Sequence, residues 1–203
     1  MTATEPTPPT DHLGIARPTA RVPLDTTGPL ATVLSWVSRR TFGAVLDPLR
    51  ASFHHRRVLF ATLRLELAVM RWRKLPRDLQ ALAVMTVAQE IGCSWCMDFG
   101  YWESHHRGVD ARKLRDVPSW RTSAVYTPLE RAVMAYASAA TATPPTVTDA
   151  QVATLRETLT DAQVVELTAL VSLENLRSRT NASLGLTSQG FRAECEVPVH
   201  TEG

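Results

Sequence analysis

The most constraining feature of the sequence is the regular placement of residues that begin and end helices. Thr-x-x-Glu and Thr-x-x-Gln sequences with the spacing of a capping box start at Thr127, Thr148 and Thr160. Glycine and proline fall between the apolar segments rather than in hairpin turns, and no alternating segment is long enough to predict a strand. The sequence therefore predicts an all-α fold of about seven or eight helices.

Apolar residues at helical spacing locate the individual helices. A first helix is expected from Pro29, and a longer one follows a break at residues 52–55. Residues 79–91 are apolar nearly all round and Pro76 fits a first helical turn, which predicts a buried central helix at 76–91. The last helix is expected at about 161–184, with four apolar residues facing inward: Val164, Leu167, Val171 and Leu176.

These helices fit one domain with flanking segments. Residues 1–27 are rich in proline and threonine and predict a disordered or extended N-terminal arm. Residues 28–185 form the predicted helical domain. Residues 186–203 are expected to be a C-terminal tail, a coil that holds Phe191 and Cys195.

Composition narrows the compartment and the partners. A net charge of +2 with 21% charged residues does not indicate a nucleic-acid partner, and the basic residues of 54–77 are expected to form a solvated surface. No apolar run approaches the ~18 residues of a membrane span. The three cysteines do not form a secreted disulfide framework, so we expect a cytoplasmic protein with no membrane contact.

The strongest functional motif is a Cys-x-x-Cys sequence, Cys93 to Cys96, directly after Gly92. The N-terminal end of a helix carries free N–H groups and a partial positive charge, which lower the pKa of a thiol placed there. Residues three apart share one face of a helix, so the two sulfurs can close a disulfide. The motif predicts a redox dithiol, and burial as two inert apolar residues is the alternative.

Other groups near the motif are weaker candidates. Glu90 and Asp98 are the carboxylates that could exchange a proton with the thiols, and Trp95 could line a pocket. Zinc at the two cysteines would need ligands from His105, His106 or Cys195. Both histidines follow Cys96 by about two and a half to three helical turns, so we expect no metal and no cofactor.

The segment EIGCSWCMDFG, preceded by LPRDLQALAVMTVAQ, resembles the carboxymuconolactone decarboxylase and alkyl hydroperoxidase D superfamily. The resemblance covers roughly residues 30–185. It implies a small alkyl hydroperoxidase D-like helical bundle that assembles as a homo-oligomer, a dimer, trimer or hexamer. It also implies antioxidant peroxidase activity on a small peroxide, with a thiol protein as reductant.

The sequence departs from the peroxide-reducing members at two positions. Their pattern has a histidine four residues after the second cysteine, where this chain has Gly100, and a glutamate twelve residues before the first, where it has Ala81. Cys93 and Cys96 match the pattern. We therefore predict a peroxidase-type thiol oxidoreductase, and the alternative is a non-catalytic helical scaffold that has lost the proton relay of the superfamily.

Overall fold

The computed structural model describes residues 20–24 and 27–196. In these ranges it has ten α-helices, one 3₁₀-helix and no strand, which confirms the predicted all-α class. Two short helices, α2 (Asp47–Ser52) and α10 (Phe191–Glu196), bring the number above the prediction. Most of the predicted arm and the last residues of the predicted tail lie outside the described ranges. None of the described helices is long and apolar enough to cross a membrane.

The chain divides into two compact units. Of the described residues, the first unit contains those up to Trp72 together with residues 183–187, and the second contains residues 73–182 and 188–196. The first unit holds α1 (Pro29–Phe42), α2 and α3 (Arg56–Val69), and α2 packs on α3. The predicted break at residues 52–55 separates α2 from α3.

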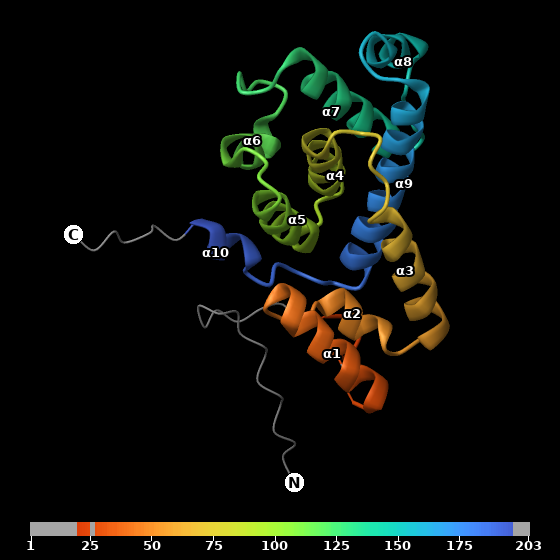
Figure 1. Cartoon of the computed structure of the whole chain (residues 1–203), viewed down its shortest axis with the longest axis vertical. Helices are drawn as coiled ribbons and strands as arrows, with labels where there is room; N and C mark the ends of the chain where they lie inside the picture. The colour runs from red at the N-terminus through yellow and green to blue at the C-terminus, as the bar shows by residue number, and fades with distance from the viewer. Residues whose placement is uncertain (1–19, 25–26, 197–203) are drawn as a thin grey trace, which may run out of the picture. The chain divides into compact units, whose positions relative to one another are not determined.

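The second unit is organised around α4 (Arg77–Ile91), which contacts both α5 (Ser94–His106) and α7 (Pro128–Thr141) and lies between them (Figure 1). The short α6 (Ala111–Asp116) and the 3₁₀-helix η1 (Val117–Ser119) join α5 to α7. The next helix, α8 (Asp149–Arg156), packs on α7. It is followed by α9 (Asp161–Ser183) and α10.

The prediction of a buried central helix at 76–91 is confirmed by α4, for which Pro76 is the N-cap residue. Apolar side chains all round α4 are at most 1% exposed: Leu82, Ala83, Met85, Val87 and Ala88. Leu82 and Met85 join a core cluster with Tyr101 of α5, Trp120 after η1 and Met134 of α7. Because the core encloses α4, it fixes the position of Gly92 and Cys93, which follow its last residue.

The predicted helix starts are also confirmed. At Thr127, Thr148 and Thr160 the threonine side chain accepts the backbone N–H of the residue three positions on, and the Glu or Gln there accepts the threonine N–H. Each reciprocal pair satisfies donors that a helix N-terminus would otherwise leave without a partner.

One predicted core position of α9 is wrong. Leu167 and Val171 are buried as expected, but Leu176 is 55% exposed. Five residues after Val171, Leu176 lies well off the buried stripe of a helix with 3.6 residues per turn. Polar residues continue the buried face instead, at Glu174, Ser178 and Asn181.

Candidate functional site

The Cys-x-x-Cys lies at the junction of α4 and α5, as predicted. Gly92 ends α4 with φ of 76°, a left-handed conformation that glycine adopts without steric cost. Cys93 is the N-cap residue of α5, and Cys96 lies in its first turn. The two cysteines are joined as a disulfide with their Cα atoms 5.3 Å apart. The junction therefore presents both sulfurs at the positive end of a helix dipole.

Each sulfur is buried and has a hydrogen-bond donor. Cys93 is 1% exposed and its Sγ accepts the backbone N–H of Cys96 at 3.2 Å. Cys96 is 6% exposed and its Sγ accepts the side-chain amide of Asn181 at 3.4 Å. Both sulfurs of the disulfide are thus enclosed and accept a hydrogen bond.

Asn181 belongs to a buried polar row on α9 that the sequence analysis did not identify. Glu174, Ser178 and Asn181 are spaced four and three residues apart and share one face, and all are at most 4% exposed. The Ser178 hydroxyl donates to the Glu174 carboxylate at 2.6 Å, and Arg177 pairs with the same carboxylate at 3.3 Å. The helical spacing of polar residues in ENLRSRTN was the available signal.

Asp98 holds the C-terminal segment onto α5. Its Oδ2 accepts the backbone N–H groups of Gln189, Gly190 and Phe191 at 2.7, 2.7 and 3.1 Å, and its Oδ1 accepts that of Arg192 at 2.8 Å. The coil predicted for this region is thus wrong at residues 191–196, where α10 forms, because a carboxylate distant in sequence supplies the acceptors for its first N–H groups. The geometry gives Asp98 a structural role.

An aromatic stripe on α5 lies beneath the same segment. Trp95 stacks on Phe99 with centroids 5.0 Å apart, and Phe99 and Trp102 both contact Phe191 of α10. The Trp95 indole N–H donates to Gln189 at 2.8 Å. Trp95 is 8% exposed and is absent from the walls of the pocket described below, so it acts here as a packing residue.

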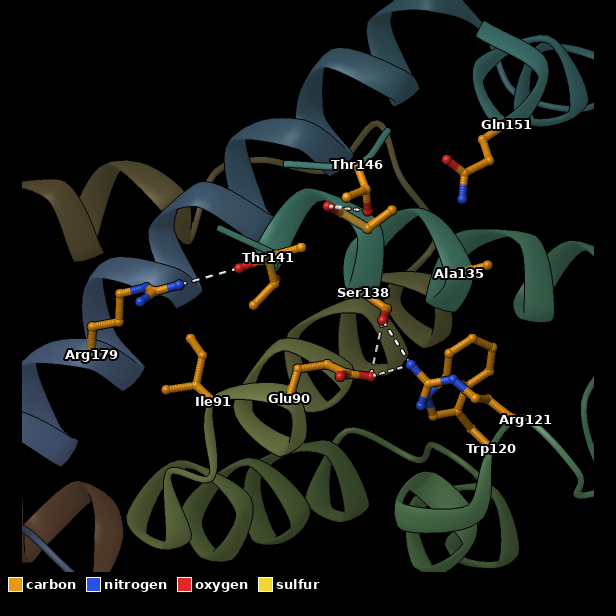
Figure 2. Close-up of a pocket in the computed structure, with 12 residues that line it drawn as sticks. Glu90, Ile91, Trp120, Arg121, Ala135, Ser138, Thr141, Thr146, Gln151 and Arg179 are labelled. Carbon is orange, nitrogen blue, oxygen red and sulfur yellow. Dashed lines mark hydrogen bonds and ion pairs between the residues drawn. The ribbon is translucent and has the colours of Figure 1, made fainter. Parts of the chain in front are cut away.

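A pocket of about 620 Å³ opens beside the end of α4, with residues of α4, α7 and α9 in its walls (Figure 2). Glu90 lies in it, 2.8 Å from the Arg121 guanidinium and 3.0 Å from the Ser138 hydroxyl. Neither cysteine lines the pocket, and the hydrogen bonds of the Glu90 carboxylate go to Arg121 and Ser138. Glu90 is thus engaged by Arg121 and Ser138, while the hydrogen bonds to the two sulfurs come from the Cys96 N–H and Asn181.

The position that matches the histidine of the peroxide-reducing pattern is tightly packed. A Cβ atom added to Gly100 would lie 2.7 Å from Sδ of Met85, which is itself 1% exposed. An imidazole at this position would require the buried Met85 side chain to move. The close packing of α4 on α5 at this point thus favours glycine over histidine at residue 100.

The remaining candidates, His105, His106 and Cys195, lie close to one another where α10 meets the C-terminal end of α5. On sequence grounds they are the candidates to complete a zinc site at Cys93 and Cys96. The structure instead makes them a separate group, because Asp98 brings α10 onto α5.

Together these features define an all-helical protein with a disulfide-forming cysteine pair at the start of a core helix. Residues 57–139 match the sequence profile of the carboxymuconolactone decarboxylase family. The chain is also 31% identical, over 166 residues, to the uncharacterized protein YnjA of Escherichia coli (strain K12), covering 81% of this chain and 89% of the relative. The protein belongs to the carboxymuconolactone decarboxylase family.

Solved structures share the fold. A peroxidase-related protein from Ralstonia eutropha JMP134, described as an alkylhydroperoxidase AhpD core, superposes with a TM-score of 0.75 at 18% identity, covering 90% of this chain and all of that one. ATU0492 from Agrobacterium tumefaciens, a protein of unknown function for which a role as antioxidant defence protein AhpD is suggested, gives 0.63 at 25% identity, covering 68% of this chain and 94% of that one. These similarities confirm the predicted AhpD-like architecture.

Proposed function

We propose that the protein is a thiol–disulfide redox enzyme that reduces small peroxides through Cys93 and Cys96. The observation that carries the proposal is the placement of both sulfurs, joined and buried, at the start of α5, where each accepts a hydrogen bond. The suggested antioxidant role of ATU0492 and the peroxidase-related description of the Ralstonia protein support the same chemistry.

The oxidative half of the reaction needs only the two thiols and a peroxide. One thiolate attacks the outer peroxide oxygen, the O–O bond breaks, and the departing alkoxide takes up a proton to leave as an alcohol. The resulting sulfenic acid is attacked by the second thiol, which releases water and forms the Cys93–Cys96 disulfide. A dithiol protein then reduces the disulfide by thiol exchange, which closes the cycle.

Asn181 acts in this proposal as a positioning residue for the Cys96 sulfur. Its amide stabilises negative charge on Cys96 from α9, a helix that does not carry the cysteines. Peroxide-reducing members have a glutamate and a histidine where this chain has Ala81 and Gly100. In their absence Asn181 supplies a polar contact to the thiolate.

The competing hypothesis is a helical scaffold without catalysis. The packing of Met85 against Gly100 favours it, because a histidine side chain at residue 100 would fit only if Met85 moved. The two hypotheses differ in the reactivity of the thiols. A scaffold should hold two slowly alkylated cysteines that do not respond to peroxide.

Stopped-flow measurement of peroxide consumption by the fully reduced protein tests the proposal. Cumene hydroperoxide and hydrogen peroxide should each oxidise about one dithiol per chain. Cys93→Ser and Cys96→Ser should each prevent the disulfide, and the variant that still forms a sulfenic acid identifies the residue that meets the peroxide. Ser94→Ala is the matched control, because Ser94 is an exposed residue between the two cysteines, and it should react like the wild type. Peroxide consumption that persists in the double Cys93→Ser/Cys96→Ser variant would contradict the proposal.

A further inference from the structure

From the trio of His105, His106 and Cys195 we infer a metal site that binds a zinc-class divalent ion and ties α10 to α5. One ligand atom from each residue, two imidazole nitrogens and one thiol sulfur, lies within 4.8 Å of the other two. Tetrahedral zinc, with bonds of about 2.0 to 2.3 Å, places its ligand atoms roughly 3.3 to 3.6 Å apart. The trio would reach that spacing if its side chains rotated on binding.

The His106 imidazole is oriented by a hydrogen bond before any ion binds. His106 donates from Nδ1 to the carbonyl oxygen of Trp102 at 2.8 Å, since a carbonyl can only accept, and Nε2 is left with a free lone pair. This is the contact that fixes the tautomer of metal-binding histidines in other proteins. The His106 ring also packs on Trp102, with centroids 4.3 Å apart, and His105 stacks on Tyr101.

The thiol is provided by α10 and lies among negative charges. Cys195 is half-buried against the core cluster of the second unit. Burial, helped by the charges of Glu194, Glu196 and Asp98, raises the pKa of its thiol. A bound cation would offset that local negative charge and stabilise the thiolate. Arg192 is the cation on the same helix, and it pairs with Glu196 at 2.9 Å.

The ligand types select the class of ion. Two imidazoles and a thiolate suit zinc and other borderline ions, and they disfavour calcium and magnesium, which prefer oxygen ligands. Three protein ligands leave the fourth position for water, and His106 lies at the exposed end of the group. The site requires neither Cys93 nor Cys96, so it is independent of the proposed redox function.

Cobalt(II) substitution tests the site, because a thiolate bound to tetrahedral cobalt gives a charge-transfer band in the near ultraviolet and visible d–d bands. The test uses the full chain without a polyhistidine tag, with Cys93→Ser and Cys96→Ser to exclude those sulfurs. We expect one equivalent of cobalt to produce the bands, and zinc to displace it. Zinc should also protect Cys195 from iodoacetamide.

Variants at the three ligands complete the test. Adding Cys195→Ser should abolish the charge-transfer band, and His105→Asn or His106→Asn should weaken binding at least about tenfold. His54→Asn, which changes a histidine of the first unit, is the control and should bind as before. Circular dichroism confirms that each variant folds. Absence of the bands in the parent protein, or bands unchanged in both histidine variants, would overturn the inference.

Discussion

A single carboxylate, Asp98, determines where the end of the chain lies. It accepts four backbone N–H groups from residues 189–192, and it is 6% exposed. Asn at this position would keep one oxygen acceptor and place an NH₂ group against backbone donors. We therefore expect Asp98→Asn to lower the free energy of unfolding by about 1–3 kcal/mol.

Urea unfolding measures this loss, and hydrogen exchange should show faster exchange at the amides of residues 189–192. Asp149→Asn, which changes an exposed first-turn carboxylate of α8, is the control. If Asp98→Asn left stability and exchange unchanged and slowed only thiol oxidation, a direct role in proton transfer would replace the structural one.

Glu130 makes stability depend on pH. Burial alone would raise the pKa of this carboxyl, but the hydrogen bond from Lys113, with the Thr127 contacts of the capping box, holds the pKa below its ordinary value of 4.5. A carboxyl with a lowered folded-state pKa stabilises the fold above its unfolded-state pKa and loses that contribution as pH falls. We expect stability to decrease on acidification below about pH 4.5.

In the Glu130→Gln variant this part of the pH dependence should disappear. At neutral pH the variant should be less stable by about 1–3 kcal/mol, because Lys113 loses its partner and the capping box its carboxylate. Denaturant unfolding at a series of pH values gives both quantities, with Glu157→Gln as an exposed control. If the difference in unfolding free energy between wild type and variant did not become smaller at low pH, Glu130 would not be the source of the pH dependence.

At the scale of elements, α9 reaches the cysteine site through its polar face. Replacing Asn181 by Ala removes the side-chain donor to the Cys96 sulfur. A hydrogen bond to a charged group contributes roughly 1.5–3 kcal/mol, so loss of this donor should raise the pKa of the Cys96 thiol. The pH dependence of Cys96 alkylation in a Cys93→Ser background measures that rise.

Thr168→Ala, which changes an exposed residue of the same helix, is the control for this experiment. The bond between Tyr136 and Thr168 ties α9 to α7, so the control also reports any general loosening of α9. An equal change in Cys96 reactivity in both variants would show that Asn181 acts only through packing.

Local patterns predicted most elements because local chemistry forms them. The capping boxes at Thr127 and Thr148 and the left-handed Gly92 give helix ends readable from a few neighbouring residues. α10 was missed because its capping residue, Asp98, is 93 residues away from its first residue. The grouping of Cys195 with two histidines depends on the same long-range contact, so spacing along the chain could not predict it.

At the scale of the whole molecule, assembly remains a prediction. Several large apolar side chains of the first unit are exposed, among them Trp36, at 66%, and Val33 on α1, and Leu67 and Phe60 on α3. A second copy of the chain that covered them would gain about 25 cal/mol for each Å² of apolar surface buried. We therefore expect at least a dimer.

Light scattering coupled to size-exclusion chromatography measures the assembly. Trp36→Glu combined with Leu67→Glu should dissociate the oligomer and leave the helical spectrum unchanged. Arg57→Glu, which replaces an exposed polar residue of α3, is the control and should leave the assembly intact. A wild-type monomer at micromolar concentration would contradict the prediction.

The central claim is that Cys93 and Cys96 form a reversible disulfide during turnover. The most direct measurement is differential alkylation of the reduced protein before and after one equivalent of peroxide, followed by peptide mapping of all three cysteines. The account predicts loss of both thiols at Cys93 and Cys96, a Cys93–Cys96 linked peptide, a Cys195 that can still be alkylated in metal-free protein, and full recovery with dithiothreitol. Three thiols unchanged by peroxide, or a major product that links Cys195 to Cys93 or Cys96, would contradict it.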